Sequence, residues 1–145
     1  KKENIKIFGG GNFMIHAGYV PIDRNDDFQA ARGILKCINY TKEGYSIAIA
    51  PEGTRNKTNE PLLPFHVGCF KAPLKAQIPM VIVGFKGNRS IYPNFFKFKK
   101  THLELKIIDV MQYDDFKDKN TFEISDIVRQ KMLDYVQSNN EAAQK

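Results

Sequence analysis

The chain has 145 residues, the length of one domain, and its hydrophobic share of 42% and charged share of 26% are ordinary for a globular protein. Its apolar runs are too short to cross a bilayer, and its start, KKENIKIFGGG, lacks the long apolar segment and cleavage site of a signal peptide. The net charge of +6 predicts attraction to polyanions such as nucleic acid, anionic lipid headgroups or an acidic carrier, without choosing among them.

The first part of the chain alternates between predicted strands and a predicted helix. Residues 17–23 (AGYVPID) indicate a short strand, and Asn25 and Asp26 can cap the helix that follows. Apolar residues recur at helical spacing and predict one buried face: Phe28, Ala31, Ile34, Leu35 and Ile38. Gly44 is expected near the C-terminal cap, and residues 45–50 (YSIAIA) are typical of a buried parallel strand.

The middle of the chain predicts a helix between two further strands. Residues 67–77 are expected to be helical, with a kink or a short first segment because Pro73 lies inside them. Residues 80–86 (MVIVGFK) predict another buried strand. Residues 102–109 alternate only in part, so they predict a strand nearer the edge of the sheet.

The last predicted element is an amphipathic helix that begins with a capping box. Asn120 followed by Glu123 has the spacing of that motif. The apolar stripe consists of Phe122, Ile127, Val128, Met132, Tyr135 and Val136. Together the elements predict one α/β domain over residues 1–138, with a mainly parallel sheet flanked by helices and a frayed polar tail over residues 139–145.

Polar residues follow two of the predicted strands, where ligands bind in parallel sheets. Arg24 follows the first strand, and Glu52, Gly53, Thr54 and Arg55 follow the second. The glycine permits a tight turn, the threonine adds a hydroxyl, and an arginine presents a planar fork that matches two phosphate oxygens. The glutamate can orient an arginine or accept a hydrogen bond from a ligand hydroxyl. The alternative is a surface turn with an ion pair of little energetic value.

A second segment interleaves aromatic residues with cations. Residues 95–100 (FFKFKK) fit three interpretations: a segment lying on a membrane surface, a platform for single-stranded nucleic acid, or a strand edge guarded by lysines. Cys37 and Cys69 lie in apolar surroundings and are expected to be buried thiols rather than a disulfide or a metal pair. We find no cluster of residues spaced for metal binding.

In combination these motifs resemble the glycerolipid acyltransferases that acylate lysophosphatidic acid. The resemblance covers residues 1–87 and rests on YVPIDRN, DFQAARGILKCI, GYSIAIAPEGTRN and LLPFHVGCFKAPLKAQIPMVIVGFKG, in that order and spacing. It implies the family's fold, and it implies that the glycerol phosphate of the acceptor is bound by Arg24, Glu52, Gly53, Thr54 and Arg55. It also implies that Pro79 lies on the acyl-donor side of the cleft.

One departure from the family pattern concerns catalysis. The resemblance implies a His-x-x-x-x-Asp pair, in which the histidine accepts the proton of the acceptor hydroxyl and the aspartate orients the imidazole. The chain has three histidines, and none is followed by aspartate at the required spacing; they are His16, His66 and His102. We therefore assign no catalytic residue within this chain, expect the pair upstream of Lys1, in a first segment missing from this sequence, and expect the chain alone to be inactive.

The resemblance implies transfer of a fatty acyl group from a thioester, carried by coenzyme A or acyl carrier protein, to lysophosphatidic acid, giving phosphatidic acid. Glycerol 3-phosphate is the alternative acceptor, since it carries the same phosphate. Without the catalytic pair, the chain could instead be a non-catalytic module that binds phosphoglycerolipids or anionic membranes. The expected location is the cytoplasmic face of a membrane, bound peripherally or through a preceding anchor. No metal or bound cofactor is expected, and no nucleic-acid motif is present.

Overall fold

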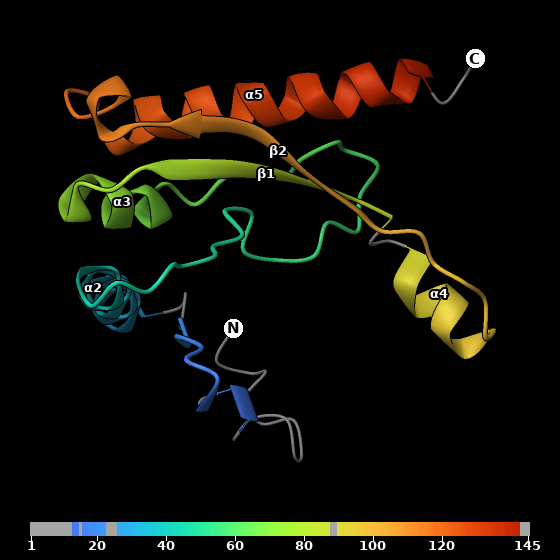
Figure 1. Ribbon diagram of the computed structural model, residues 1–145, viewed down its shortest axis with the longest axis horizontal. Coiled ribbons are helices and arrows are strands. Elements are labelled where there is room, and N and C mark those ends of the chain that lie inside the picture. The colour runs from blue at the N-terminus through green and yellow to red at the C-terminus, as the bar shows by residue number, and fades with distance from the viewer. Residues whose placement is uncertain (1–12, 15, 23–25, 88–89, 143–145) are drawn as a thin grey trace.

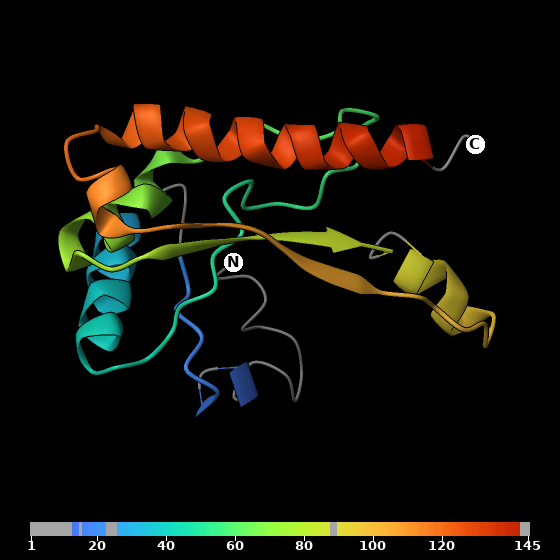
Figure 2. The same cartoon turned by 45° about the horizontal axis from the view of Figure 1, so that its top comes forward.

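The computed structural model describes residues 13–14, 16–22, 26–87 and 90–142 (Figure 1). The principal elements, in chain order, are α2 (Asp27–Lys42), η2 (Val67–Phe70), α3 (Lys71–Ala76), β1 (Met80–Lys86), α4 (Ile91–Phe96), β2 (Glu104–Met111), η4 (Tyr113–Asp115) and α5 (Thr121–Ala142). Helix α5 lies along one face of the two strands, while α2 and α3 pack together near one end of the sheet (Figures 1 and 2).

The sheet is antiparallel, so the predicted mainly parallel sheet is wrong for the described residues. Strands β1 and β2 pair from Met80 opposite Met111 to Lys86 opposite Glu104. A parallel pair needs a connection that crosses over the sheet, usually through a helix on its face. Here α4 lies beyond the ends of the strands, so the connection only reverses the direction of the chain (Figure 1).

Two segments predicted as strands are irregular. Residues 45–50 form no strand, and neither do residues 17–22; Asp23, the last residue of that predicted strand, lies outside the described residues. Ile47 packs against the cluster between α2 and α3, but Tyr45 is 64% exposed. An apolar run becomes a strand only when it pairs with a neighbouring strand, and among the described residues neither segment has such a partner.

Helix α2 begins and ends as the sequence predicts. The Asp26 carboxylate accepts hydrogen bonds from the amides of Phe28 and Gln29, both at 3.0 Å. Gly44 follows the C-terminal cap with a left-handed φ of +90°. The predicted apolar face is only partly correct. The residues that pack toward α3 are Ile34, Cys37 and Ile38, whereas Phe28 and Leu35 are exposed.

The predicted helix over residues 67–77 is present as a short first segment followed by a helix. The 3-10 segment η2 leads directly into α3, which ends at Gln77 in a left-handed conformation. Pro73 is the third residue of α3. It therefore falls in the first turn of the helix, where a backbone N–H has no intrahelical partner and a proline is tolerated.

The predicted capping box of α5 is confirmed. The Asn120 side chain accepts hydrogen bonds from the amides of Phe122 and Glu123, and the Glu123 carboxylate accepts one from the Asn120 amide at 2.7 Å. The helix continues to Ala142, into the segment predicted as a frayed tail. The extent of the domain, residues 1–138, stays a prediction.

The main core lies between α5 and the inner face of the sheet. Its buried residues come from η2, both strands and the C-terminal part of the chain: Phe70, Ile82, Met111, Phe116, Ile124 and Val128. Gly84 also faces α5, and a Cβ atom at this position would collide with the ring of Tyr135. The glycine therefore allows the helix to approach the sheet closely.

The opposite face of the sheet is apolar and exposed. Residues from β1 and β2 pair across it: Val81 with Val110, Val83 with Ile107, and Phe85 with Leu105. Their exposed fractions range from 37% for Val83 to 63% for Leu105. We call this set the outer sheet face. Among the described residues, no helix is long and apolar enough to cross a membrane.

Candidate functional site

The candidate site begins with a tight turn over residues 50–53. Pro51 takes the second position, which suits its fixed φ, and the Gly53 amide donates a hydrogen bond to the Ala50 carbonyl oxygen at 3.0 Å. Gly53 has a φ of +63°, a left-handed conformation that glycine adopts without steric cost. The backbone conformation at this position of the PEGTR motif therefore favours glycine.

Two further hydrogen bonds close the following residues into a loop. The Glu52 carboxylate accepts a hydrogen bond from the Leu63 amide at 2.8 Å, and the Pro51 carbonyl oxygen accepts one from the His66 amide at 2.9 Å. Both bonds join the end of this segment to the turn at its start. We call residues 52–66 the site loop. Glu52 thus holds the shape of this loop, a role that the sequence did not predict.

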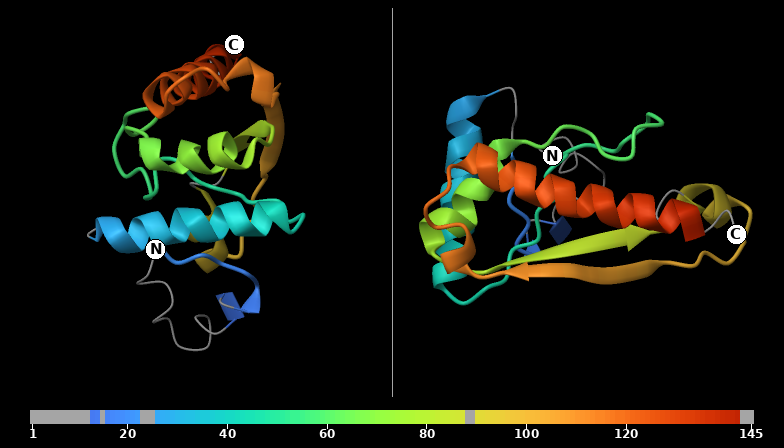
Figure 3. Two further views of the ribbon diagram at one scale, coloured as in Figure 1. Left: turned by 90° about the vertical axis from the view of Figure 1, so that its left-hand side faces the viewer. Right: turned by 90° about the horizontal axis from the view of Figure 1, so that it is seen from above.

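The site loop is also anchored at its tip and to the C-terminal helix. The Asn56 side chain donates a hydrogen bond to the Glu60 carbonyl oxygen at 2.8 Å and accepts one from the Thr58 amide at 2.9 Å. Leu62 is buried, and Arg129 of α5 donates to its carbonyl oxygen at 3.5 Å. The loop lies on the same side of the two strands as α5 (Figure 3).

Four predicted site residues therefore share one anchored turn, with a graded exposure. Glu52 and Gly53 are half-buried, whereas Thr54 and Arg55 are exposed. A hydroxyl and a guanidinium on consecutive exposed residues can both donate hydrogen bonds to an oxyanion, and the guanidinium can do so through two parallel bonds. The arrangement is suited to holding a phosphate at the protein surface.

The two other predicted site residues are not joined to this turn by the described structure. Arg24 lies outside the described residues, so its convergence with Arg55 stays a prediction. Pro79 is exposed and directly precedes β1. Its predicted place on the acyl-donor side is likewise untested.

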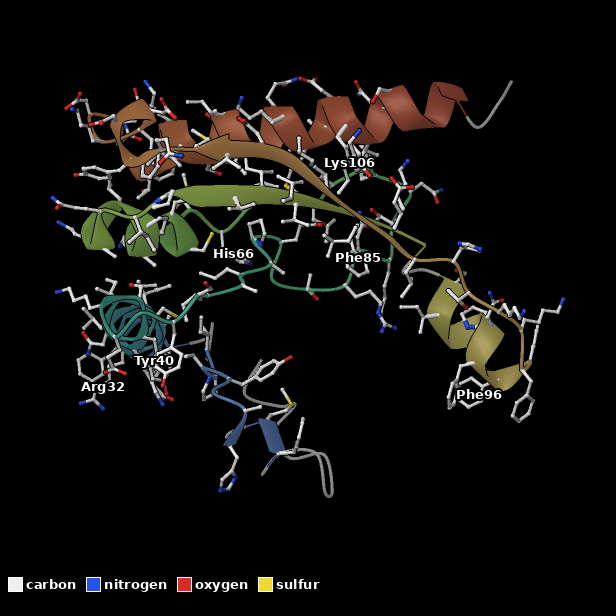
Figure 4. The ribbon with its side chains drawn as sticks, in the orientation of Figure 1. Arg32, Tyr40, His66, Phe85, Phe96 and Lys106 are labelled. Carbon is white, nitrogen blue, oxygen red and sulfur yellow. The ribbon has the colours of Figure 1, made fainter. Side chains whose placement is uncertain are left out.

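The histidines occupy separate segments. His16, His66 and His102 are all exposed. His66 is nearest to the candidate site in the chain, at the end of the site loop, where its backbone amide binds the turn (Figure 4). This hydrogen bond uses the backbone of His66 and does not involve its imidazole.

The two cysteines are free thiols. Cys37 is buried and Cys69 is half-buried. Burial raises the pKa of the Cys69 thiol to about 11, and burial also raises the pKa of Cys37. Both therefore stay protonated near neutral pH and are poor nucleophiles. Within the part of the chain that the structure describes, no group of three or more His, Cys, Asp or Glu residues could hold a metal ion.

The chain is similar to one known protein family over more than half of its length. A model described as Acyltransferase matches residues 1–86. The chain is 31% identical over 104 residues to the chloroplastic 1-acyl-sn-glycerol-3-phosphate acyltransferase BAT2 of Brassica napus, covering 72% of this chain and 29% of that protein.

Two bacterial relatives match in the same way. The 1-acyl-sn-glycerol-3-phosphate acyltransferase of Escherichia coli is 31% identical over 112 residues, which cover 77% of this chain and 44% of that protein. The protein of the same name from Salmonella typhimurium is 39% identical over 84 residues, which cover 57% of this chain and 34% of that protein. The matched stretch thus spans less than half the length of each of these relatives. No solved structure gives a significant match.

Proposed function

Because the chain belongs to the acyltransferase family, we propose that it carries the acceptor-binding part of an enzyme that acylates lysophosphatidic acid. The reaction moves a fatty acyl group from a thioester donor to the free hydroxyl of the acceptor and gives phosphatidic acid. The relatives described above are 1-acyl-sn-glycerol-3-phosphate acyltransferases, which supports this acceptor over glycerol 3-phosphate. The thioester is carried by coenzyme A or acyl carrier protein.

The observation that carries the proposal is the anchored PEGTR turn. Glu52 accepts the Leu63 amide and so shapes the turn, and the turn continues into two exposed residues, Thr54 and Arg55. In the proposed complex these two side chains hold the acceptor phosphate, and Arg24 is the second cation. Fixing the phosphate aims the neighbouring hydroxyl at the thioester, an orientation effect that contributes roughly 7 kcal/mol at best.

The remaining proposed roles concern the donor and the lipid surface. Pro79 is assigned to the acyl-donor side, and the acceptor and product, being amphiphiles, place the reaction at a membrane surface. The proton of the acceptor hydroxyl must pass to a general base. No histidine of this chain is followed by the aspartate of the family pair, so we assign the base to none of the three.

The test of the proposal is ligand binding by Arg55 variants. We expect Arg55→Ala to weaken binding of glycerol 3-phosphate and of a short-chain lysophosphatidic acid by about 2 kcal/mol, because a charged hydrogen-bond donor is lost. Arg55→Lys should also weaken binding, since an ammonium cannot form two parallel bonds. Titration calorimetry with each ligand measures both effects.

The matched control is Arg32→Ala. Arg32 is an exposed arginine of α2, and its guanidinium carbon lies 4.5 Å from the centroid of the Phe28 ring. Its replacement by alanine changes the net charge by the same amount as Arg55→Ala. We expect it to leave ligand affinity unchanged. If both Arg55 variants bind these ligands with the affinity of the parent, Arg55 does not bind the phosphate and the proposed site is wrong. An equal loss with Arg32→Ala would mean that only the overall charge matters.

A second candidate function is a non-catalytic module that binds phosphoglycerolipids. The anchored turn together with the missing His-x-x-x-x-Asp pattern favours it for this chain. The two functions separate in an assay with acyl-CoA and lysophosphatidic acid. We expect no turnover by this chain at concentrations at which it binds the acceptor. Turnover would show that a base lies among its own residues.

A further inference from the structure

The C-terminal end of α4 and the residues that follow it present three phenylalanine side chains to solvent. Phe95 is 73% exposed, Phe96 is 71% exposed and Phe98 is 100% exposed. We call residues 95–100 the α4 tip. The α4 tip lies at the far end of the molecule from α2 and α3 and projects beyond the strands, as the label on Phe96 shows (Figure 4). Isolated exposed apolar residues are common, but three within one short protruding segment are not.

The α4 tip is an ordered turn. The Lys99 amide donates to the Asn94 carbonyl oxygen at 2.9 Å, and the Phe98 amide donates to the Phe95 carbonyl oxygen at 3.2 Å. These are the two bonds of a Schellman motif, which ends a helix with one left-handed residue. The Asn94 side chain then donates to the Lys100 carbonyl oxygen at 3.2 Å. One asparagine therefore ties both ends of the turn.

Phe98 occupies the position of this motif that usually holds glycine. Its φ is +51°, a left-handed conformation that is unfavourable for a bulky side chain. Its ring packs on nothing in the described structure, since it is fully exposed. Local backbone preference and folding thus give no reason for phenylalanine here, whereas a ligand outside the protein would.

The charges of the α4 tip indicate the ligand. Lys97, Lys99 and Lys100 are all exposed and alternate with the phenylalanines. The strand-edge interpretation of this segment is wrong, because the segment ends a helix. We propose that the α4 tip inserts its phenylalanine rings at the surface of an anionic lipid bilayer, with its lysines bound to the headgroups.

Two features favour a bilayer over single-stranded nucleic acid. The rings of Phe95 and Phe96 meet at 86°, so they do not form a common flat platform on which successive bases could stack. The tip also protrudes from the molecule. A protruding segment can insert into a bilayer surface, whereas a nucleic-acid strand is usually bound along a groove. The inference concerns a surface apart from the site loop and does not rest on the proposed function.

The first experiment uses the lack of tryptophan in this chain. Phe98→Trp introduces a single fluorophore at the tip, and Phe122→Trp introduces one at a phenylalanine that is 66% exposed near the start of α5, at the other end of the molecule. With vesicles of phosphatidylcholine and phosphatidylglycerol we expect a blue shift for Phe98→Trp alone. No shift at position 98, or equal shifts at both positions, would overturn the proposal.

The second experiment removes the ring without harming the turn. Phe98→Gly places the preferred residue in the left-handed position, so the variant should melt at or above the parent temperature. We expect its affinity for the anionic vesicles, measured by co-sedimentation, to fall at least about tenfold, because burial of one ring is lost. The matched control is Phe122→Ala. Phe122 lies in helix α5, where a glycine would destabilise the helix, so alanine is used there instead. We expect this variant to bind the vesicles as the parent does.

The charge contribution is tested with a pair of double variants. Lys97→Glu with Lys99→Glu is expected to abolish the preference for phosphatidylglycerol, since each lysine removed weakens binding about fivefold. Lys71→Glu with Lys75→Glu changes two exposed lysines of α3 and alters the net charge equally. Equal losses of vesicle binding in the two double variants would overturn the proposal. The proposal would also be overturned if Phe98→Gly weakened oligonucleotide binding and left vesicle binding unchanged.

The outcomes can be told apart from those of the proposed function. Vesicles without lysophosphatidic acid test the α4 tip alone, and a soluble glycerol phosphate tests Arg55 alone. We expect Phe98→Gly to bind glycerol 3-phosphate with the affinity of the parent. We expect Arg55→Ala to co-sediment with the anionic vesicles as the parent does.

Discussion

The Glu52 carboxylate shows how one side chain can serve both the fold and the site. It is half-buried and accepts the Leu63 amide across the site loop. We expect Glu52→Ala to lower the free energy of unfolding by about 1–2 kcal/mol, because a backbone donor loses a charged acceptor. Urea unfolding measures the change. Thr54→Ala, at the exposed next-but-one position, is the control and should unfold as the parent does; equal midpoints for both variants would contradict this role of Glu52.

The site could be predicted from the sequence only in part at the level of residues. The sequence predicted a turn at Gly53, because a glycine between a proline and polar residues favours one. The loop-closing role of Glu52 could not be predicted, since its partner is the amide of Leu63 and a backbone amide carries no side-chain signature. The anchoring of Leu62 by Arg129 was equally hidden, because the two lie 67 positions apart in sequence and in different elements.

The packing of α5 against the sheet depends on a missing side chain. A Cβ atom at Gly84 would collide with the ring of Tyr135. We expect Gly84→Ala to destabilise the protein by about 1–3 kcal/mol through overpacking. Thermal or urea unfolding checks this, with Gly68→Ala as control, because a Cβ at Gly68 has no atom within 4 Å. A similar loss in both variants would mean that glycine content, and not this contact, is responsible.

The ion pair between Asp109 of β2 and Lys131 of α5 makes the stability depend on pH. The Lys131 ammonium donates to the Asp109 carboxylate at 2.8 Å. This hydrogen bond, aided by the Val110 amide, lowers the pKa of Asp109 below its ordinary value. The carboxylate thus binds its proton less tightly in the folded state than in the unfolded state. Its contribution to stability is complete above the unfolded pKa of about 3.9 and is lost as the pH falls through the lower folded value.

The corresponding variant is Asp109→Asn. We expect it to be less stable than the parent at neutral pH and equally stable at a pH below the folded pKa of Asp109. Unfolding curves at several pH values provide the measurement. A difference that persists unchanged into acid would show that the carboxylate charge is not its source.

Local signals predicted the elements well, and long-range pairing was the source of error. The caps at Asp26 and Asn120 depend on neighbours a few positions away, so the sequence contains all that is needed to find them. Residues 45–50 were predicted as a strand because short apolar runs favour one, but a strand also needs a partner of compatible register. The direction of the sheet depends on where α4 lies, and the hydrogen bonds from Asn94 to Lys100 and Thr101 that hold α4 to the chain leading into β2 have no simple sequence signature.

The outer sheet face is a contiguous exposed apolar surface formed by both strands. An apolar surface shared by two strands promotes association between copies as the protein is concentrated. We expect Ile107→Lys, at a position that is 58% exposed, to raise the concentration that stays monomeric in sedimentation experiments with little effect on stability. Phe122→Lys removes an apolar residue outside this face. Equal gains from both variants would point to net charge instead of the face.

The anchoring of the core by the C-terminal helix bears on how the protein can be shortened. The family match ends at residue 86, yet Ile124 and Val128 cover the same interior as Phe70 and Ile82. A version that ends at residue 86 would retain every motif of the family. It would lose the helix that covers one side of the hydrophobic core. Recombinant work on the phosphate-binding turn should therefore keep the final helix, although that helix carries no signature of its own.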